Sequence, residues 1–387
     1  MILTNIKIEG LFNKFNYDIQ LDKKEEVTIL YGLNGIGKTT ILNILFLFSH
    51  LNFIKIFELH FNKLNFKFGP YGEKMKDLLE LNVIFTKNDE ISIIFNIKIN
   101  DYEYEQKFSD LNEITGICLL LTSNFATLKK KKKILELKLH QNNPSKEELI
   151  SIITFFIYEF QTYHIESLRN SINNPIILEE YYQEREVFKK KFEDTNINLE
   201  IDIPRYEKQF KDFKFIPQVQ IRVLNDLMNY FYKRKLMIIS QNLSTLPKED
   251  EGIQLFIKII NNYFDFKKMS FDQKDGILIV LDDEIKSKIP FPLLSSGEKN
   301  LLIIFYEIIF EAQNESLILI DEPEISLNIN WHYDFIDTLR EVAEERNLYF
   351  LIATHSPQIV NNYTDNCVDA DYKEPYKDKD EHNESEI

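Results

Sequence analysis

The chain has 387 residues, of which 44% are hydrophobic and 28% charged, a balance typical of a globular protein that is long enough to bury a substantial core. Acidic residues outnumber basic residues by 62 to 46 and give a formal net charge of −16, which disfavours a protein that coats nucleic acid with its whole surface. Two cysteines are too few for a disulfide framework, and the lack of a long apolar run or an export signal leads us to expect a cytoplasmic protein with no membrane partner.

The first part of the chain is expected to combine strands with one helix. Residues 2–9 and 15–21 have the pattern of short strands, and residues 27–31 form a continuous apolar run typical of a strand buried on both faces. A glycine-rich turn follows this run, and a helix is expected to begin at Lys38. Alternating segments within residues 80–108 predict the antiparallel strands of a small β subdomain.

The middle of the chain, from about residue 110 to 265, has a helical composition interrupted by single prolines. No heptad pattern lasts long enough to predict a coiled coil. The expected elements are a short strand at 163–167 and helices near 125–140, 145–160, 178–193, 218–236 and 253–268.

The last third of the chain returns to a mixed pattern. Residues 364–387 are rich in charge, and this composition predicts a disordered acidic tail. The expected elements before the tail are a hairpin of 276–281 with 285–289, helices at 298–313 and 328–346, and strands at 317–320 and 348–353.

Residues 32–39, Gly-Leu-Asn-Gly-Ile-Gly-Lys-Thr, match the phosphate-binding loop pattern at every fixed position. Glycines let successive backbone N–H groups point into one concave site, and the positive end of the following helix also attracts phosphate. Lys38 is expected to reach the β- and γ-phosphates of the nucleotide, and Thr39 to offer its hydroxyl to Mg²⁺. The expected nucleotide contacts in this loop are Asn34, Gly35, Gly37, Lys38, Thr39 and Thr40.

A second motif is an apolar strand that ends in two carboxylates, Asp321 and Glu322. Asp321 is expected to support the Mg²⁺ ion, and Glu322 to orient the attacking water or accept its proton. Acidic residues after a strand are a weak signal alone, but after a phosphate-binding loop a catalytic pair is the better interpretation.

Two more motifs complete the set. Ser295-Ser296-Gly297-Glu298 opens a predicted helix and resembles the signature motif of ABC-type ATPases. In that family the phosphate loop of one subunit and the signature of another enclose the same ATP, so the serine hydroxyl, the glycine N–H and the helix N-terminus form an anion site. His355 occupies the place of the family's switch histidine, which senses the γ-phosphate.

The four motifs, in this order, resemble an ABC-type ATPase over about residues 1–60 and 270–362. The Ser-Ser-Gly-Glu signature resembles that of RecF, SMC and OLD proteins more than that of transporters. Residues 321–327 resemble the extended motif of OLD-like AAA ATPases from prokaryotic antiviral systems, in which the Glu-Ile-Ser-Leu stretch lies at the subunit interface.

This resemblance implies an α/β fold, namely an ABC-type P-loop ATPase head with an antiparallel β subdomain and an inserted helical domain. It implies ATP and Mg²⁺ as cofactors, and a homodimer or higher homo-oligomer joined through composite ATP sites. The expected domains are the amino-terminal half of the head at 1–110, the helical insertion at 111–268, the carboxy-terminal half of the head at 269–363 and the tail at 364–387.

The biological role is expected from the same resemblance. OLD nucleases carry a nuclease domain after the ATPase head, whereas only 32 residues follow His355 here. We therefore expect a separate effector protein, such as a nuclease, as in two-component antiphage systems of the PARIS or Septu type, with this chain as the ATP-hydrolysing sensor or assembly subunit. A RecF- or Rad50-like DNA-repair ATPase and an ATP-dependent binding scaffold with little turnover remain as alternatives, and Ser296 disfavours a transporter subunit.

Some assignments stay open. Gln106 and Gln161 are both candidates for the glutamine that the family places between the phosphate loop and the signature. Arg169 is either a surface arginine or a contact to phosphate or to the neighbouring subunit. The five lysines at 129–133 form either a solvated helix face or a contact to a nucleic acid backbone, so nucleic acid stays open as a partner.

Overall fold

The computed structural model describes a defined part of the chain: residues 2–21, 26–69, 79–87, 91–99, 102–128, 145, 148–150, 152, 153, 157, 160, 162–165, 236, 239–243, 250–272, 276–282, 286–290, 293–325 and 327–369. The chain divides into two compact units. The first unit combines residues 1–165, 312–324 and 329–387, and the second unit combines residues 166–311 and 325–328.

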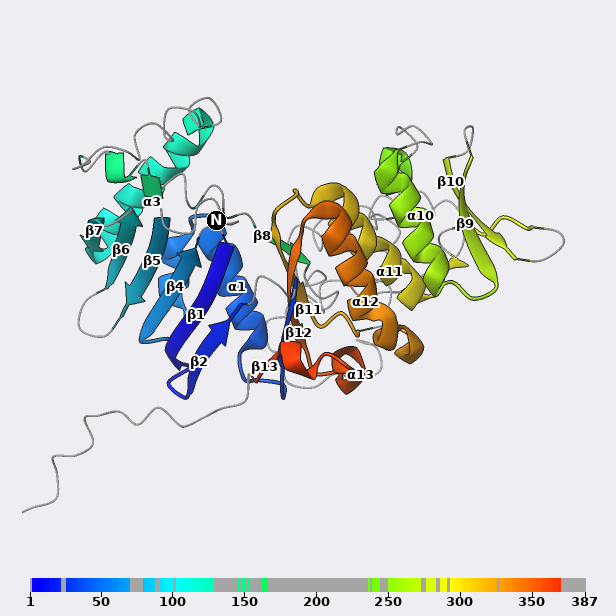
Figure 1. Ribbon diagram of the computed structural model, residues 1–387, viewed down its shortest axis with the longest axis horizontal. Coiled ribbons are helices and arrows are strands. Elements are labelled where there is room, and N and C mark those ends of the chain that lie inside the picture. The colour runs from blue at the N-terminus through cyan, green and yellow to red at the C-terminus, as the bar shows by residue number, and fades with distance from the viewer. Residues whose placement is uncertain are drawn as a thin grey trace, which may run out of the picture. The chain divides into compact units, whose positions relative to one another are not determined.

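A six-stranded antiparallel sheet lies in the first unit (Figure 1). Its strands alternate apolar and polar side chains, as the buried Leu64, Phe66 and Phe68 illustrate, so one face of the sheet packs on the core and the other is polar. The strands are β1 (Ile2–Leu11), β2 (Phe15–Gln20), β4 (Lys63–Gly69), β5 (Leu79–Thr86), β6 (Ser92–Ile99) and β7 (Tyr102–Ser109), in the order β2-β1-β4-β5-β6-β7.

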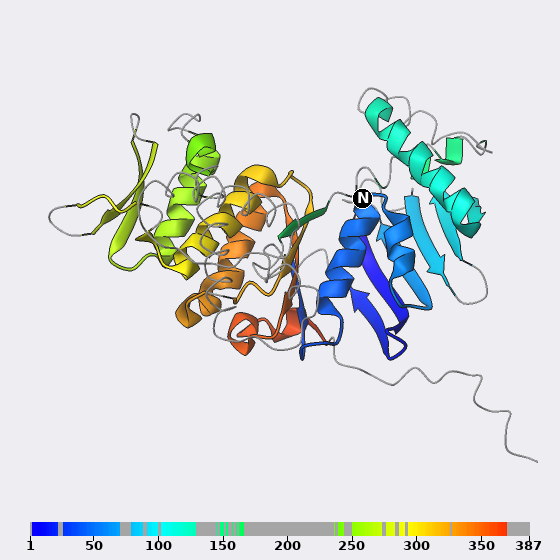
Figure 2. The same cartoon turned by 180° about the vertical axis from the view of Figure 1, so that it is seen from behind.

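Helices α1 (Lys38–Ser49), α2 (Phe53–Glu58) and α3 (Asp110–Leu128) belong to the same unit. Figure 2 shows α1 and α3 across one face of the antiparallel sheet. Their buried side chains share one hydrophobic core with the apolar face of the sheet. Phe48 lies at the centre of this core, because its ring contacts those of Phe53, Phe66 and Phe85.

A five-stranded parallel sheet carries the predicted motifs of the first unit. Its strands are β3 (Val27–Tyr31), β8 (Thr162–Ile165), β11 (Leu317–Asp321), β12 (Tyr349–Thr354) and β13 (Cys367–Asp369), in the order β13-β3-β12-β11-β8. Every neighbouring pair is parallel, so all the carboxyl ends meet at one edge. Helix α1 contacts β8, β11 and β12, whereas α12 (Ile329–Arg346) contacts β12 and β3.

The second unit contains α10 (Glu251–Tyr263), β9 (Lys267–Asp272), β10 (Gly276–Leu281), α11 (Ser296–Tyr306) and the π-helical turn η3 (Glu307–Glu311). Asp250 caps α10 by accepting a hydrogen bond from the Ile253 N–H. The apolar face of α10, with Phe256 at its centre, packs near α11 and η3.

Several predicted elements are confirmed. Residues 27–31 form β3, a helix begins at Lys38, and β5, β6 and β7 cover the predicted antiparallel region. The strand predicted at 163–167 is β8 over Thr162–Ile165, and residues 166 and 167 lie outside the described residues. The helix predicted at 298–313 begins at Ser296 as α11 and continues as η3 to Glu311.

Two predicted elements in the second half need correction. The helix predicted at 253–268 ends at Tyr263, because the Asn261 side chain instead hydrogen-bonds both the N–H and the carbonyl of Met269 and so fixes a turn into β9. Strand β10 pairs along its length with β9, and the predicted partner at 285–289 contributes only a bridge between Val280 and Lys288 with flanking backbone hydrogen bonds.

Residues 364–369, the first part of the predicted disordered tail, are folded. Thr364–Asn366 forms the 3₁₀ turn η4, and Cys367–Asp369 adds a parallel strand, β13, to β3. The Asn366 side chain donates a hydrogen bond to the Val27 carbonyl, which ties this segment to the core of the first unit.

The lysines at 129–133, most residues of the helices predicted at 178–193 and 218–236, and the tail beyond 369 lie outside the described residues. The limits of the two compact units differ from the predicted domain boundaries at 110 and 268, which stay predictions. Within the described part of the chain, no helix combines the length and the apolar character needed to cross a membrane.

Candidate functional site

The phosphate loop connects β3 to α1, and its shape depends on glycine. Gly37 has a φ of 101° directly before α1, and a Cβ atom there would lie 2.7 Å from Cδ2 of Leu11 and 3.2 Å from Cε2 of Phe12. Glycine is therefore required both for the left-handed backbone and for the close packing of the β1–β2 hairpin. The Tyr17 hydroxyl also donates a hydrogen bond to the Ile36 carbonyl, which anchors the loop to β2.

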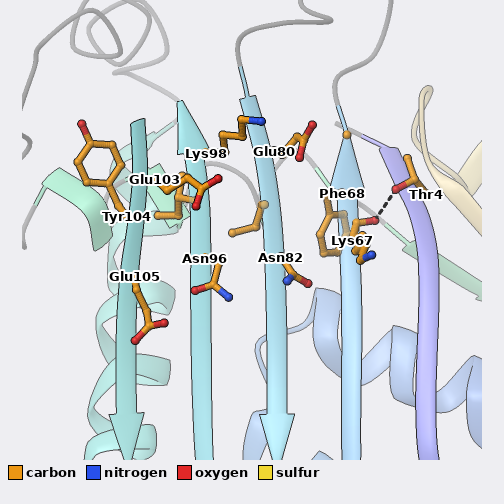
Figure 3. A pocket seen from close by; sticks show the side chains of 13 residues that line it. Thr4, Lys67, Phe68, Glu80, Asn82, Asn96, Lys98, Glu103, Tyr104 and Glu105 are labelled. Atoms are coloured by element: carbon orange, nitrogen blue, oxygen red, sulfur yellow. Dashed lines mark hydrogen bonds between the residues drawn. The ribbon is translucent and has the colours of Figure 1, made fainter. Parts of the chain in front are cut away.

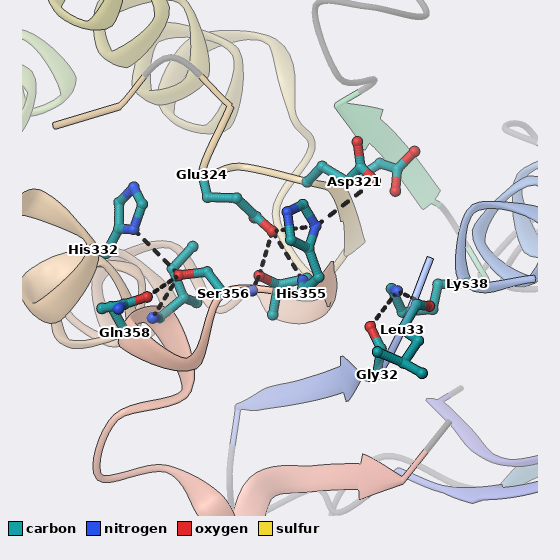
Figure 4. A network of polar contacts seen from close by, with 12 residues as sticks. Gly32, Leu33, Lys38, Asp321, Glu324, His332, His355, Ser356 and Gln358 are labelled. Carbon is teal, nitrogen blue, oxygen red and sulfur yellow. Dashed lines mark hydrogen bonds and ion pairs between the residues drawn. The ribbon is translucent and has the colours of Figure 1, made fainter. Parts of the chain in front are cut away.

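Lys38 is held beneath the loop. Its side chain is buried, and Nζ donates hydrogen bonds to the carbonyls of Gly32 at 2.7 Å and Leu33 at 2.8 Å (Figure 4). A Cβ atom at Gly35, whose φ is 86°, would meet no atom within 4 Å, so this part of the loop borders open space. The remaining predicted contacts lie in the loop or in the first turn of α1: Asn34, Thr39 and Thr40.

Thr39 and Asp321 bring the loop and the second motif together. The Thr39 hydroxyl donates a hydrogen bond of 3.1 Å to Oδ1 of Asp321, and Asp321 is only 2% exposed. Burial raises the pKa of Asp321 to about 6; the neighbouring Glu322 and Glu324 add to the increase, while the Thr39 hydrogen bond and the Lys38 charge oppose it.

This pair of groups fits Mg²⁺. The ion prefers oxygen ligands and is usually held by one or two protein groups together with phosphate oxygens and water, and a hydroxyl beside a buried carboxylate provides such a set. A bound cation also offsets the burial of the Asp321 charge. In the described residues, no group of three or more His, Cys, Asp or Glu side chains is arranged to hold a metal ion by itself.

Glu322 leaves the strand with an unusual backbone. Its φ is 46°, a left-handed value that is uncommon for a residue with a Cβ atom and that occurs preferentially at functional sites. Its N–H donates a hydrogen bond of 2.8 Å to the Ala353 carbonyl, which stabilises this conformation. The Glu322 side chain is 21% exposed and remains accessible to a small molecule such as water.

His355 lies directly after β12, at the same edge of the sheet as Asp321 (Figure 4). Its Nδ1 is 3.0 Å from Oε1 of Glu324 and 4.0 Å from Oε1 of Glu322, and its side chain is 43% exposed. Glu324 Oε1 also accepts hydrogen bonds from the Thr354 hydroxyl at 2.8 Å and from the His355 N–H at 2.9 Å. The imidazole thus lies next to two carboxylates, one buried and one accessible.

The signature residues lie at the start of α11, in the second unit. The Ser295 hydroxyl accepts a hydrogen bond from the Glu298 N–H, and Glu298 Oε2 accepts one from the Ser295 N–H, which forms a capping box. Glu298 Oε1 is 2.5 Å from Nζ of Lys267. Burial favours a higher pKa for Glu298, but the hydrogen bonds from Lys267 and Ser295 outweigh it and lower the pKa. Ser296 is exposed and Gly297 is buried.

The structure thus gathers Lys38, Thr39, Asp321, Glu322 and His355 at one sheet edge. A nucleotide role for Ser295, Ser296, Gly297 and Glu298 stays a prediction. Both carboxylate oxygens of Glu298 are already engaged within the second unit.

Neither Gln106 nor Gln161 is supported as the family's glutamine between the phosphate loop and the signature. Gln106 lies on β7, an outer strand of the antiparallel sheet, and its side-chain amide donates to the Glu105 carbonyl. Gln161 and Arg169 lie outside the described residues.

A separate pocket of about 710 Å³ lies on the antiparallel sheet (Figure 3). Polar side chains from neighbouring strands line it, including Lys67, Asn82, Asn96, Lys98 and Glu105. None of the predicted site residues lines this pocket, so it is distinct from the phosphate loop.

The anchoring roles of two residues were not predicted from the sequence. Tyr17 anchors the phosphate loop, and Glu324 anchors His355. The sequence contains a weak signal for Glu324 alone, since a third acidic residue follows Asp321 and Glu322 within three positions. Nothing in the local pattern around Tyr17 distinguishes it from other strand tyrosines.

The profile of the AAA ATPase domain family matches residues 1–360 of the chain. Septu protein PtuA of Bacillus thuringiensis is 26% identical over 177 residues, which are 42% of this chain and 43% of PtuA. Protein ea59 of Escherichia phage lambda is 32% identical over 75 residues, or 19% of this chain and 14% of ea59. The matched segments therefore span less than half the length of either relative.

Among solved structures, the SMC head domain from Thermotoga maritima is 12% identical, with 93% of this chain and 91% of that chain covered at a TM-score of 0.40. The family match carries more weight, because it includes every motif of the site from Lys38 to His355. The parallel sheet that bears these motifs and the accompanying antiparallel sheet agree with the predicted α/β architecture. The chain therefore belongs to the AAA ATPase domain family and is a P-loop ATPase of the ABC type.

Proposed function

We propose that the chain hydrolyses ATP in a Mg²⁺-dependent reaction and serves as the sensor or assembly subunit of a prokaryotic antiviral system whose effector is a separate protein. The observation that carries the chemical part is the meeting of Lys38, Thr39, Asp321, Glu322 and His355 at the carboxyl ends of three adjacent parallel strands. The site contains a cation for phosphate, oxygen ligands for a metal ion and an accessible carboxylate for water.

In this proposal each residue has a separate task. The loop N–H groups and Lys38 bind the β- and γ-phosphates, and Thr39 and Asp321 hold Mg²⁺, which when bound neutralises charge on the phosphates. Glu322 orients the attacking water and accepts its proton, and its left-handed φ of 46° marks the point where the chain leaves the strand. His355 responds to the presence of the γ-phosphate.

The defence role is supported by the 26% identity to Septu protein PtuA over 177 residues. Composite sites, in which the α11 terminus of one copy completes the phosphate loop of another, are supported by the exposed Ser296 at a capped helix N-terminus. ATP binding would then stabilise a closed oligomer, and hydrolysis would release it.

The ATPase proposal is tested with Glu322→Gln, a variant that keeps the size of the side chain but removes the base. We expect phosphate release to fall about 100-fold or more, while equilibrium binding of ATP remains close to that of the unchanged protein. Lys38→Ala is the matched comparison, since it should lose nucleotide binding itself. Turnover of Glu322→Gln equal to that of the unchanged protein, or turnover unaffected by EDTA, would contradict the proposal.

The defence role needs a cellular test. A bacterial host that carries the gene with its natural neighbours is challenged with a panel of phages, beside hosts that carry the Glu322→Gln variant or the chain alone. We expect reduced plaque formation only when the active chain and its neighbouring effector are both present. Undiminished plaquing together with sensitivity to DNA damage on gene deletion would favour the DNA-repair alternative instead.

A further inference from the structure

Glu324 is a buried carboxylate with strongly asymmetric contacts. Its side chain is 6% exposed, and a single oxygen, Oε1, lies within hydrogen-bond distance of three donors on the β12–α13 turn (Figure 4). The second oxygen, Oε2, is buried and has no hydrogen-bond partner among the described residues. Burial of a carboxylate is unfavourable unless hydrogen bonds offset the cost. The hydrogen bonds that Oε1 accepts provide this offset for Glu324.

The first consequence concerns the backbone of the turn. Oε1 accepts hydrogen bonds from the Thr354 hydroxyl and the His355 N–H. Thr354 is fully buried, and its hydroxyl in turn accepts a hydrogen bond of 3.0 Å from the Ser356 N–H. Ser356 then caps the short helix α13 (Pro357–Val360). These bonds join the turn on both sides of His355 to the segment that follows Asp321.

The second consequence concerns the imidazole ring. Nδ1 of His355 is 3.0 Å from Glu324 Oε1 but 4.0 Å from Glu322 Oε1, which is beyond hydrogen-bond range. A carboxylate only accepts hydrogen bonds, so a hydrogen bond from the ring to Oε1 at this distance requires a proton on Nδ1. In the neutral ring Nε2 is then the unprotonated nitrogen, and Glu322 stays free of the histidine.

We propose that Glu324 is the positioning residue of His355, which it holds in the Nδ1–H tautomer with Nε2 as the nitrogen that faces the substrate. This inference rests on the proposed function, in which His355 responds to the γ-phosphate. Glu324 makes no contact with substrate in this role. It acts by fixing the place, orientation and tautomer of the histidine, as carboxylates do for metal-binding histidines.

The tautomer is measured directly by NMR of protein labelled with ¹⁵N-histidine, at a pH of about 9 where histidine is ordinarily neutral. The chain has seven histidines, and the His355→Gln variant identifies the signals that belong to His355. We expect a protonated Nδ1 and an unprotonated Nε2 in the unchanged protein, and a shift toward the Nε2–H tautomer in Glu324→Ala. A protonated Nε2 in the unchanged protein, or the same tautomer in Glu324→Ala, overturns the proposal.

Steady-state kinetics provide the second readout. We expect Glu324→Ala to lower kcat on the order of 10- to 100-fold, with KM for ATP within about twofold of the unchanged value. Glu324→Gln keeps an oxygen acceptor, so it should retain a higher kcat and a larger population of the Nδ1–H tautomer than Glu324→Ala. It also provides the test if Glu324→Ala folds poorly. Glu345→Gln, at an exposed position of α12, is the matched control and should change neither quantity. An unchanged kcat in both Glu324 variants, or a loss confined to KM, overturns the proposal.

The two experiments separate this inference from the proposed function. The NMR spectrum needs no turnover, so a protein that binds but does not hydrolyse ATP would refute the ATPase proposal and still reveal the tautomer of His355. A Nε2–H tautomer in an active ATPase would refute only the role of Glu324.

Discussion

At the scale of single residues, the ionised Asp321 carboxylate lowers the stability of the nucleotide-free protein. Its pKa rises from 3.8 to about 6, chiefly because the carboxyl group is buried, so ionising it in the folded chain costs up to about 3 kcal/mol. The sign follows from the direction of the shift: the destabilisation is small below pH 3.8, grows between pH 3.8 and the folded-state pKa of about 6, and is constant above that value, so it is fully present at pH 7.

Asp321→Asn is therefore expected to stabilise the nucleotide-free protein at pH 7 by about 1 to 3 kcal/mol, while ATP hydrolysis falls sharply because a metal ligand is lost. Chemical unfolding at pH 7 and at pH 4 measures the first effect, which should nearly vanish at the lower pH. An exposed control, Asp334→Asn on α12, should show no gain at either pH. A destabilised Asp321→Asn protein at pH 7 would mean that hydrogen bonding of the charged form outweighs its burial.

The residues that were predicted and those that were missed differ in a physical way. Lys38, Thr39, Asp321 and Glu322 follow from short motifs, because the chemistry fixes residue types at fixed spacing around one turn. The anchoring role of Glu324 depends on bonds to residues about 30 positions away, and that of Tyr17 on a bond across 19 positions. Such contacts leave no periodic pattern in a single sequence.

At the scale of elements, strands with a continuous apolar run were predicted closely, since Val27–Tyr31 and Leu317–Asp321 are buried along their length. The errors occur where tertiary pairing decides the outcome. Cys367–Asp369 has no strand pattern of its own and is a strand because β3 offers it a free edge. The helix predicted to 268 stops early because Asn261 pairs with Met269, a competition that helical periodicity does not reveal.

The phosphate loop allows a matched test at this scale. Gly35 and Gly37 both have positive φ angles, but only at Gly37 would a Cβ atom collide with the β1–β2 hairpin. Gly35→Ala should cost about 1 kcal/mol of stability from backbone strain alone, and Gly37→Ala about 1 to 3 kcal/mol more because Leu11 and Phe12 must move. Thermal unfolding of the nucleotide-free proteins measures both. Equal losses would show that the hairpin does not support the loop.

At the scale of the whole molecule, the proposed composite site requires two copies of the chain. Each copy would contribute a phosphate loop to one site and the start of α11 to the other. Two differently damaged copies should then restore one another, because a heterodimer contains one site in which both halves are intact. Such complementation does not occur if each chain hydrolyses ATP alone.

Lys38→Ala removes the phosphate-binding cation, and Ser296→Glu places a negative charge where the partner's γ-phosphate would lie. Glutamate in the first turn of α11 suits the helix dipole and leaves the Ser295–Glu298 capping box in place, so the second variant should fold normally. Each variant alone should be nearly inactive. An equal mixture that exchanges freely as dimers should recover about a quarter of the unchanged activity, because half the dimers are mixed and each has one intact site of two. A mixture as inactive as its components, with exchange verified by a labelled subunit, would exclude shared sites.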